Sequence, residues 1–288
     1  MVKMLLAKPP PFDHEIVILT RKPTSATVQQ LAENPKIKVV QGDMDDCPAI
    51  FDACGGKGSI WGVFCMTMPS MKKLQEGVVD KEVRQGNSMV DAAIENRVQH
   101  FVFSSVDRGG EKSFDNPTPI PHFITKHEIE HHLRNACVGS GMTYTVLRPV
   151  AFMDNLTPNI IGRIFAAAWA QMEPKKLQLV ATADIGVFAV LAFSNSESED
   201  FKNQAIGLAG DDLSQSEAAQ IFWDVVQRPM VQTYWFIANL VKYMMGDLGT
   251  MFKWFETDGY GVDIARCKKL NPEMLDFKTW LAEESKFN

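Results

Sequence analysis

The stretch that decides the fold is EGVVDKEVRQGNSMVDAAIEN at residues 76–96, followed directly by RVQHFVFSSV at 97–106. In the first part, apolar residues recur every three or four positions, which predicts a helix with one apolar face. In the second part, residues 101–103 form a continuous apolar run, typical of a strand covered on both faces in a parallel sheet. The strand ends at Ser104 and Ser105, at the edge where open α/β sheets place their ligands.

The chain on either side of this stretch alternates strands and helices. Strands are predicted near residues 15–19, 37–40, 62–66 and 144–147, with helical segments between them. This spacing indicates parallel βαβ units and therefore an α/β fold with a doubly wound parallel sheet. From about residue 150 onward helix patterns dominate, although a short strand is predicted at 205–209.

Composition excludes several classes of protein. The 288 residues carry a net charge of −6, which favours solubility and argues against direct nucleic-acid binding. The five cysteines are odd in number and scattered, which predicts reduced thiols and neither a disulfide framework nor a zinc site. The longest apolar run, 235–245, is shorter than the roughly 20 residues that span a bilayer. We therefore expect a cytoplasmic protein, also compatible with the nucleus, that does not bind a membrane.

Several segments, in this order along the chain, resemble the NmrA-like family, whose members are atypical relatives of the short-chain dehydrogenases. The segments are LTRKP (19–23), VVQGDMDD (39–46), EVRQGNSMVDAAIENRVQHFVFSSV (82–106), HFITKHEIEHHL (122–133), LRPVAFMDNL (147–156) and LAGDDLSQSE (208–217). The resemblance covers nearly the whole chain. It implies a Rossmann-type domain at residues 1–150 that binds NADP(H), and a smaller, mainly helical substrate-side region at 151–288.

The sequence departs from the family's pattern at its start. Members begin with a strand and a Gly-x-x-Gly-x-x-Gly turn, which holds the cofactor's pyrophosphate at a helix N-terminus, whereas this chain opens inside the helix that follows. That strand would lie between the strands at 15–19 and 62–66, so we expect both to have an unpaired edge. We expect either that this start lies within a longer protein or that strong cofactor binding has been lost.

Arg21 and Lys22 are the first candidate cofactor-binding residues along the chain. They follow a strand at the position where a basic side chain suits the 2′-phosphate of NADP, although a solvated basic pair is the alternative. The resemblance places six further residues beside the cofactor: Asp43, Thr67, Lys126, Pro149, Phe152 and Asn155. For Asp43 and Thr67 an ordinary loop position fits equally well, and the Arg-Pro pair that ends the last strand is also common strand punctuation.

Lys126 and His122 are the candidate catalytic residues. In a helix over 123–137, Lys126 falls within about 60° of the apolar stripe through Ile129 and Leu133, so its side chain is expected to point inward. In short-chain dehydrogenases the lysine of a Tyr-x-x-x-Lys pair holds the nicotinamide ribose. Here the pair is His122-x-x-x-Lys126, and histidine transfers protons near neutral pH. A lysine whose stem only covers the core is the alternative.

Residues 127–131 have the His-Glu-x-x-His spacing of zinc peptidases. The same helical projection places His127 and His131 opposite the apolar stripe, toward solvent. No third ligand is suitably spaced, so we expect no metal site.

Two functions fit these features. One is an NADP(H)-linked oxidoreductase acting on an unidentified small molecule, resembling fungal enzymes of secondary metabolism, with Ser104 or Ser105 orienting a carbonyl. The other is a non-catalytic regulator that senses NADP(H) and binds a partner protein such as a transcription factor. An aromatic, methionine-rich stretch from Tyr234 to Phe255 is a candidate partner face, and core is the alternative.

Overall fold

The computed structural model describes residues 1–69, 80–244 and 246–287. They fall into two compact units that interleave along the chain. The first unit comprises Met1–Ser105, Thr125–Leu147 and Gly186–Ile206, and the second comprises Val106–Ile124, Arg148–Ile185 and Gly207–Asn288. Each unit is thus made of three separate segments of the chain, whereas the sequence analysis places one boundary at residue 150. That the cofactor binds before this boundary and the substrate after it stays a prediction.

Strands and helices alternate in the first unit, as the sequence predicts. Its elements, some of which continue into the second unit, are α1 (Val2–Ala7), β1 (Ile16–Thr20), α2 (Ala26–Ala32), β2 (Ile37–Gln41), α3 (Cys47–Ala53), β3 (Gly62–Met66), α4 (Lys81–Glu95), β4 (His100–Ser104), α5 (Pro121–Cys137), β5 (Thr143–Pro149), α7 (Thr182–Ser194) and β8 (Gln204–Leu208).

The strands of the first unit form two sheets. β1 pairs in parallel with β2, while β3, β4, β5 and β8 follow one another in a four-stranded sheet whose first three strands are parallel. Over the described residues no ladder joins β1 to β3. The unpaired edges predicted at 15–19 and 62–66 are therefore confirmed. The strand predicted at 205–209 lies in this sheet as β8, beside β5.

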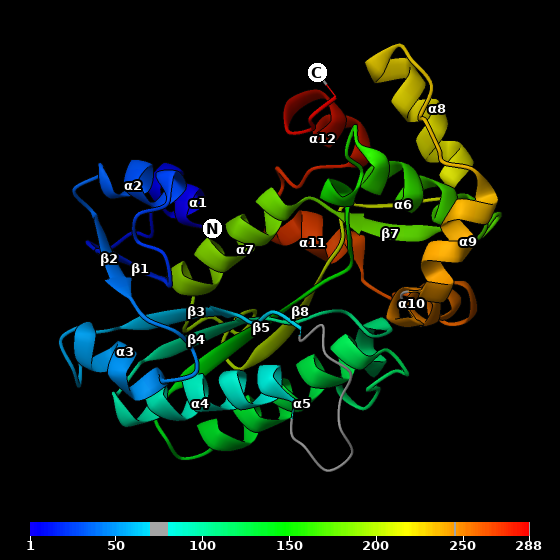
Figure 1. The fold of residues 1–288 in the computed structure, drawn as a ribbon. Coiled ribbons are helices and arrows are strands. Elements are labelled where there is room, and N and C mark those ends of the chain that lie inside the picture. Colours follow the sequence, from blue (N-terminus) through cyan, green and yellow to red (C-terminus); the bar gives the residue numbers. More distant parts are fainter. Residues whose placement is uncertain (70–79, 245, 288) are drawn as a thin grey trace. The chain divides into compact units, whose positions relative to one another are not determined.

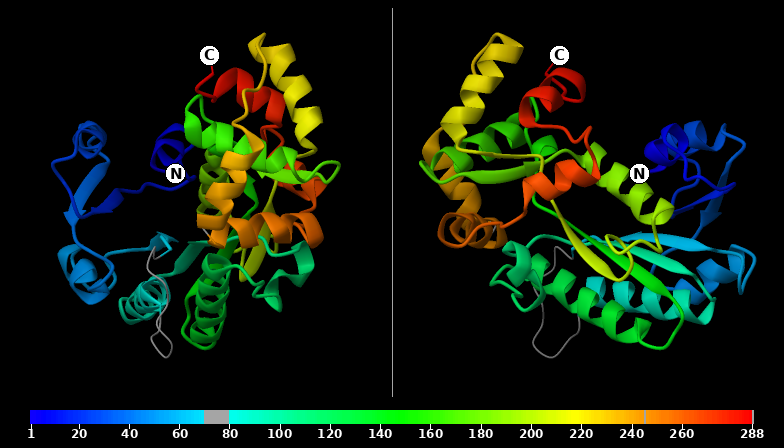
Figure 2. Two further views of the ribbon diagram at one scale, coloured as in Figure 1. Left: turned by 45° about the vertical axis from the view of Figure 1, so that its right-hand side comes forward. Right: turned by 180° about the vertical axis from the view of Figure 1, so that it is seen from behind.

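Helices α4 and α5 cover one face of the four-stranded sheet (Figures 1 and 2). The apolar face predicted for the first of them is confirmed from Val83 to Ala93, and positions 76–79 lie outside the described residues. Gly86 lets the two helices approach closely, because a Cβ there would lie 2.6 Å from Cδ1 of Ile129. All five residues of β4 are buried, as expected for a strand covered on both faces.

His100, at the start of β4, is a fully buried histidine in the first unit. Its Nδ1 lies 2.8 Å from Oγ1 of Thr143, its Nε2 lies 3.1 Å from Oγ1 of Thr145, and the ring of Phe193 packs against it. Burial lowers the pKa of His100 to about 4, because the charged imidazolium is poorly solvated there.

This shift predicts that the protein loses stability in mild acid. The unfolded chain protonates His100 near pH 6.5 and the folded chain only near pH 4, so stability falls as the pH drops through that window. Between pH 7 and pH 5 the wild type should lose about 2 kcal/mol more unfolding free energy than His100→Gln. Urea unfolding of both proteins at both pH values measures this difference. Equal losses would show that His100 is not held neutral.

The second unit packs helices around a small sheet. Its strands β6 (Ala151–Phe152), β7 (Leu177–Val180) and β9 (Asp211–Leu213) form a three-stranded sheet in that order. Its helices are η1 (Gly110–Phe114), η2 (Met153–Asn155), α6 (Ile160–Ala170), α8 (Gln215–Val226), α9 (Trp235–Met244), α10 (Gly246–Thr257), α11 (Ile264–Leu270) and α12 (Phe277–Glu283). Ser214 and Glu217 form a capping box that begins α8. Of the helices in the described ranges, none is both long and apolar enough to cross a bilayer.

Candidate functional site

Lys126 lies in a buried polar cluster at the carboxyl end of β3, in the first unit. Its side chain is 11% exposed, so the prediction that it points inward is confirmed. The position follows from α5, whose apolar stripe faces the sheet and carries Lys126 with it. Its Nζ also lies 5.5 Å from the ring centre of Phe103 on β4, an attractive cation–π geometry.

Three oxygen atoms surround the ammonium group of Lys126. Nζ lies 2.9 Å from Oε1 of Glu82 and donates hydrogen bonds to the carbonyl oxygen and Oγ1 of Thr67 at 2.8 and 2.7 Å. Since a lysine has three N–H donors, this set satisfies all of them. A ribose hydroxyl would therefore have to displace one of these partners.

Glu82, in the first turn of α4, is the centre of the cluster and is fully buried. Its Oε1 accepts from Oγ1 of Thr67 at 2.8 Å, and its Oε2 accepts from Oγ1 of Thr125 at 2.6 Å. The negative charge is also favoured by its place at a helix N-terminus. Sequence reasoning missed Glu82 and Thr125. The sequence does contain a signal for Glu82. It lies four residues before Gly86, on the buried face of α4, and this spacing predicts that its side chain points toward the core.

β4 ends at Ser104, Ser105 follows it directly, and both side chains are buried. The hydroxyl of Ser105 donates a hydrogen bond to Oε1 of Glu130 on α5. Ser105 and Glu130 thus form a second buried pair of hydroxyl and carboxylate, beside that of Thr125 and Glu82. Ser105 could orient the carbonyl group of a substrate only after its hydrogen bond to Glu130 is broken.

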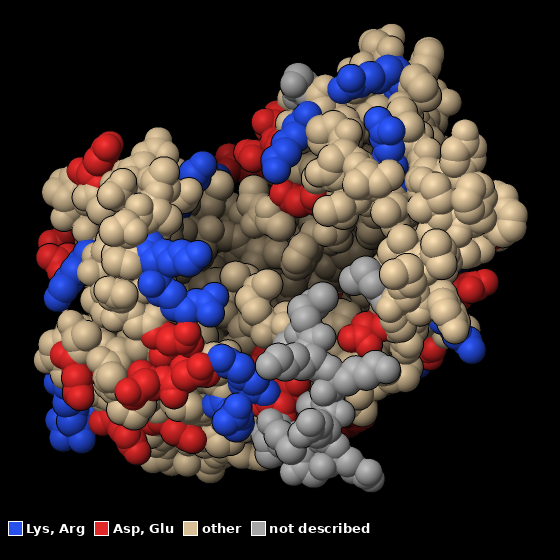
Figure 3. All heavy atoms as spheres, viewed as in Figure 1, with Lys and Arg blue, Asp and Glu red and all other residues tan. Residues whose placement is uncertain are grey.

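Arg21, Lys22 and Asp43 lie at the carboxyl ends of β1 and β2. Both basic side chains are exposed, and Nη1 of Arg21 lies 3.7 Å from Oδ2 of Asp43. Exposed pairs of this kind contribute at most about 1 kcal/mol, so an anionic ligand could exchange with the carboxylate. Figure 3 shows basic and acidic side chains interspersed over the face it draws.

The remaining predicted site residues belong to the second unit. His122 is half-buried in the first turn of α5, with its ring 4.9 Å from that of Phe123. Pro149 ends β5, Phe152 lies in β6 with 37% of its surface exposed, and Asn155 is exposed in η2. Among the predicted site residues, Arg21 contacts Asp43 and Lys126 contacts Thr67. The roles of the other predicted site residues stay predictions.

The prediction that His127 and His131 face solvent is wrong in part. Both side chains are half-buried, with ring centroids 4.3 Å apart one turn from each other on α5. Packing of one ring on the other removes surface that a helical projection counts as open. Within the described ranges, no group of three or more His, Cys, Asp or Glu side chains is placed to hold a metal ion.

The aromatic stretch from Tyr234 to Phe255, predicted as a candidate partner face, contains both buried and exposed side chains. Phe252, Trp254 and Phe255 are buried in the core of the second unit, so for them the interface prediction is wrong. The exposed members lie before and on α9: Tyr234, Trp235, Phe236, Tyr243 and Met244. Met245 lies outside the described residues.

The parallel sheet covered by helices, with polar side chains gathered at the carboxyl ends of its strands, defines a Rossmann-type α/β protein. The model of the NmrA-like family matches residues 1–282, so the chain belongs to that family. The nitrogen metabolite repression protein nmr of Neurospora crassa is 24% identical over 202 residues. The match covers 66% of this chain and 37% of that protein, so the chain spans well under half of its length.

Solved structures share the fold at low sequence identity. NmrA, a negative transcriptional regulator in complex with NADP, superposes with a TM-score of 0.70 at 15% identity, covering 99% of this chain and 90% of that one. Citrobacter sp. triphenylmethane reductase complexed with NADP(H) gives 0.71 at 15% identity, covering 98% and 94%. An NADPH-dependent quinone oxidoreductase of Escherichia coli gives 0.65 at 19% identity, covering 98% and 93%.

Proposed function

We propose that this protein binds NADP(H) and acts as a regulator that senses the cofactor, together with a protein partner, without turning over a substrate. One observation carries this choice. All three N–H groups of Lys126 have partners in Glu82 and Thr67, so the lysine that would hold a nicotinamide ribose is engaged within the first unit. The similarity to NmrA and to the nitrogen metabolite repression protein supports the regulatory role.

Two basic residues of the first unit suit the adenosine end of NADP(H). Arg21 and Lys22 are exposed at the carboxyl end of β1, where two positive charges suit a 2′-phosphate. We therefore assign the preference for NADP(H) over NAD(H) to the adenosine end of the cofactor.

An NADP(H)-linked oxidoreductase is the second candidate. It is favoured by the likeness to the two reductases and by His122, which lies one turn before Lys126 on α5. In this case His122 would donate a proton to a small-molecule substrate. Lys126 would exchange one bond to Thr67 for the cofactor's ribose.

The test is a calorimetric titration with NADPH and with NADH, followed by addition of carbonyl and quinone substrates. We expect micromolar binding that prefers NADPH, and no oxidation of NADPH. Arg21→Glu should weaken NADPH binding by about tenfold or more, since the added negative charge repels the 2′-phosphate. Lys36→Glu is the matched control, because Lys36 is exposed just before β2, at the opposite end of the same sheet. Steady oxidation of NADPH would overturn the regulatory role in favour of the second candidate.

A further inference from the structure

Helix α9 of the second unit is apolar on two opposite faces. One face packs against α6 and α10 and includes Ala238, which is fully buried. The opposite face carries Phe236, Leu240, Tyr243 and Met244, whose spacing places them on one side of the helix. All four are exposed, Tyr243 to 87%. In an ordinary surface helix this outer face would be polar.

Two aromatic side chains just before this face widen the apolar surface. Tyr234 and Trp235 are both exposed. The ring of Tyr234 stacks on that of Phe236 at 5.6 Å, and the ring of Trp235 packs edge-on against Phe236 at 6.1 Å. Helix α9 lies at the edge of the second unit (Figure 1). The continuous surface, called the α9 patch below, consists of Tyr234, Trp235, Phe236, Leu240, Tyr243 and Met244.

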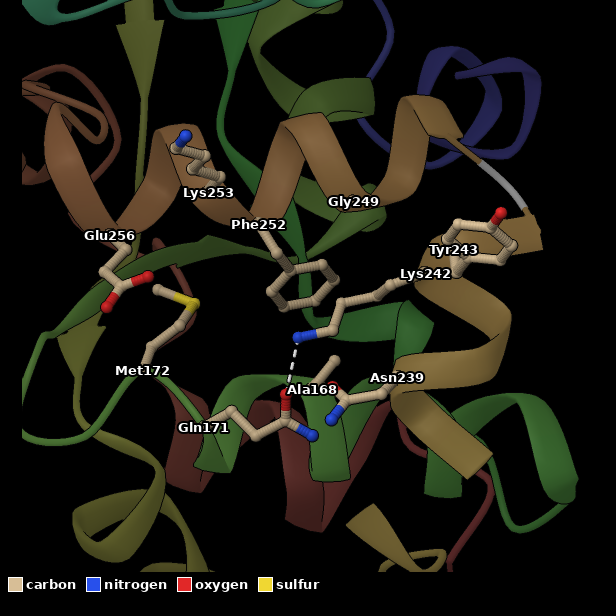
Figure 4. Close-up of a pocket in the computed structure, with 10 residues that line it drawn as sticks. All are labelled: Ala168, Gln171, Met172, Asn239, Lys242, Tyr243, Gly249, Phe252, Lys253 and Glu256. Atoms are coloured by element: carbon tan, nitrogen blue, oxygen red, sulfur yellow. Dashed lines mark hydrogen bonds between the residues drawn. The ribbon is translucent and has the colours of Figure 1, made fainter. Parts of the chain in front are cut away.

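The α9 patch carries no charge. Lys242 is the only charged residue in the sequence of α9, and its Nζ donates to Oε1 of Gln171 at 2.5 Å, at the end of α6. Figure 4 shows Lys242 reaching from α9 toward Gln171. In Figure 3 the surface over most of α9 is accordingly free of charged side chains. Two copies of the patch can therefore meet without repulsion between like charges.

The exposed area of the α9 patch matches that of a protein–protein interface. With about 200 Å² for a fully exposed side chain of this size, the six side chains together expose on the order of 800 Å². A standard interface buries about 800 Å² on each partner. The largest apolar patch of a typical monomer is smaller, about 300–600 Å².

We propose that the α9 patch is the interface of a homodimer, in which α9 packs against α9 of a second copy of this chain about a two-fold axis. A two-fold interface joins the same patch of both subunits, so the patch must be complementary to itself. An uncharged apolar surface meets this condition. Nucleic acids and anionic membranes are disfavoured, because they would require basic side chains that the patch lacks.

The test is sedimentation equilibrium of the whole chain, for which we expect a dimer with a Kd below about 10 μM. Leu240 is central in the exposed face of α9, so it is expected to meet its own copy near the axis. Leu240→Glu and Leu240→Lys should each raise the Kd at least about a hundredfold, because two like charges would meet in the interface. An equal mixture of the two variants should dimerise again, since opposite charges then meet.

Val138→Glu is the matched control, because Val138 is 82% exposed and belongs to the first unit, outside the α9 patch. It should leave the Kd within about twofold of the wild type. Circular dichroism checks that every variant is folded, as expected for substitutions at exposed positions.

The proposal is overturned if the wild type is monomeric at about 100 μM. A monomer that binds phosphatidylcholine vesicles would overturn it in favour of a membrane surface. The proposal also fails if Leu240→Glu and Val138→Glu dimerise equally well, or if the two Leu240 variants stay monomeric when mixed. The interface uses none of the residues assigned above to NADP(H), so its failure would leave the proposed function standing.

Discussion

Lys126→Met is expected to lower the free energy of unfolding by about 3–5 kcal/mol. The methionine fills a similar volume, but it leaves the fully buried carboxylate of Glu82 without its cation. It also removes the donors that Oγ1 and the carbonyl oxygen of Thr67 accept from. Denaturant unfolding followed by circular dichroism measures the loss.

A double variant and a control variant show whether the loss of stability comes from the pair of Lys126 and Glu82 or from the loss of any lysine. Adding Glu82→Gln to Lys126→Met should recover at least half of the lost stability, because a neutral amide can still accept from Thr125. Lys81→Met should cost at most about 1 kcal/mol, since the pair it breaks, with Asp45, is exposed. Similar losses for Lys126→Met and Lys81→Met would contradict the picture of a closed, buried cluster.

Asp107→Ala is expected to destabilise the second unit by a similar amount, about 3–5 kcal/mol. The carboxylate of Asp107 is 1% exposed and accepts hydrogen bonds from the N–H groups of Gly109, Gly110 and Gly261 and from Oγ of Ser113, at 3.0 to 3.1 Å. Alanine would leave these donors without an acceptor. Thermal unfolding of the variant measures the effect.

The two loops that Asp107 joins are in direct contact. Gly110 has a φ of 63°, and a Cβ there would lie 2.1 Å from the carbonyl oxygen of Gly261, so the loops touch through their backbones. Asp115→Ala, an exposed neighbour in the same loop, should change stability by less than about 0.5 kcal/mol. A comparable loss in both variants would contradict the assigned role of Asp107.

Hydrophobic periodicity predicted the elements of the first unit because their burial follows from local spacing. The continuous apolar run before Ser104 became a fully buried strand, and the stripe through Ile129 carried Lys126 inward. The unpaired edges of β1 and β3 were also predictable, since they follow from which strands the sequence contains.

Long-range pairing was not predictable from local spacing. Nothing near Glu82 in the sequence distinguishes a buried partner of Lys126 from an ordinary acidic residue in a first helical turn. Likewise, composition cannot separate Phe252, which is core, from Tyr243, which is exposed one helix earlier. Both outcomes depend on how helices pack, which only the three-dimensional arrangement reveals.

The central claim is that this chain binds NADP(H) through the carboxyl end of β1. Calorimetric titration of the folded protein with NADPH and NADH tests it most directly. Micromolar binding that prefers NADPH, weakened about tenfold or more by Arg21→Glu and unchanged by Lys36→Glu, is the predicted result. No detectable binding of either nucleotide by a folded chain, or equal binding of both, would contradict it.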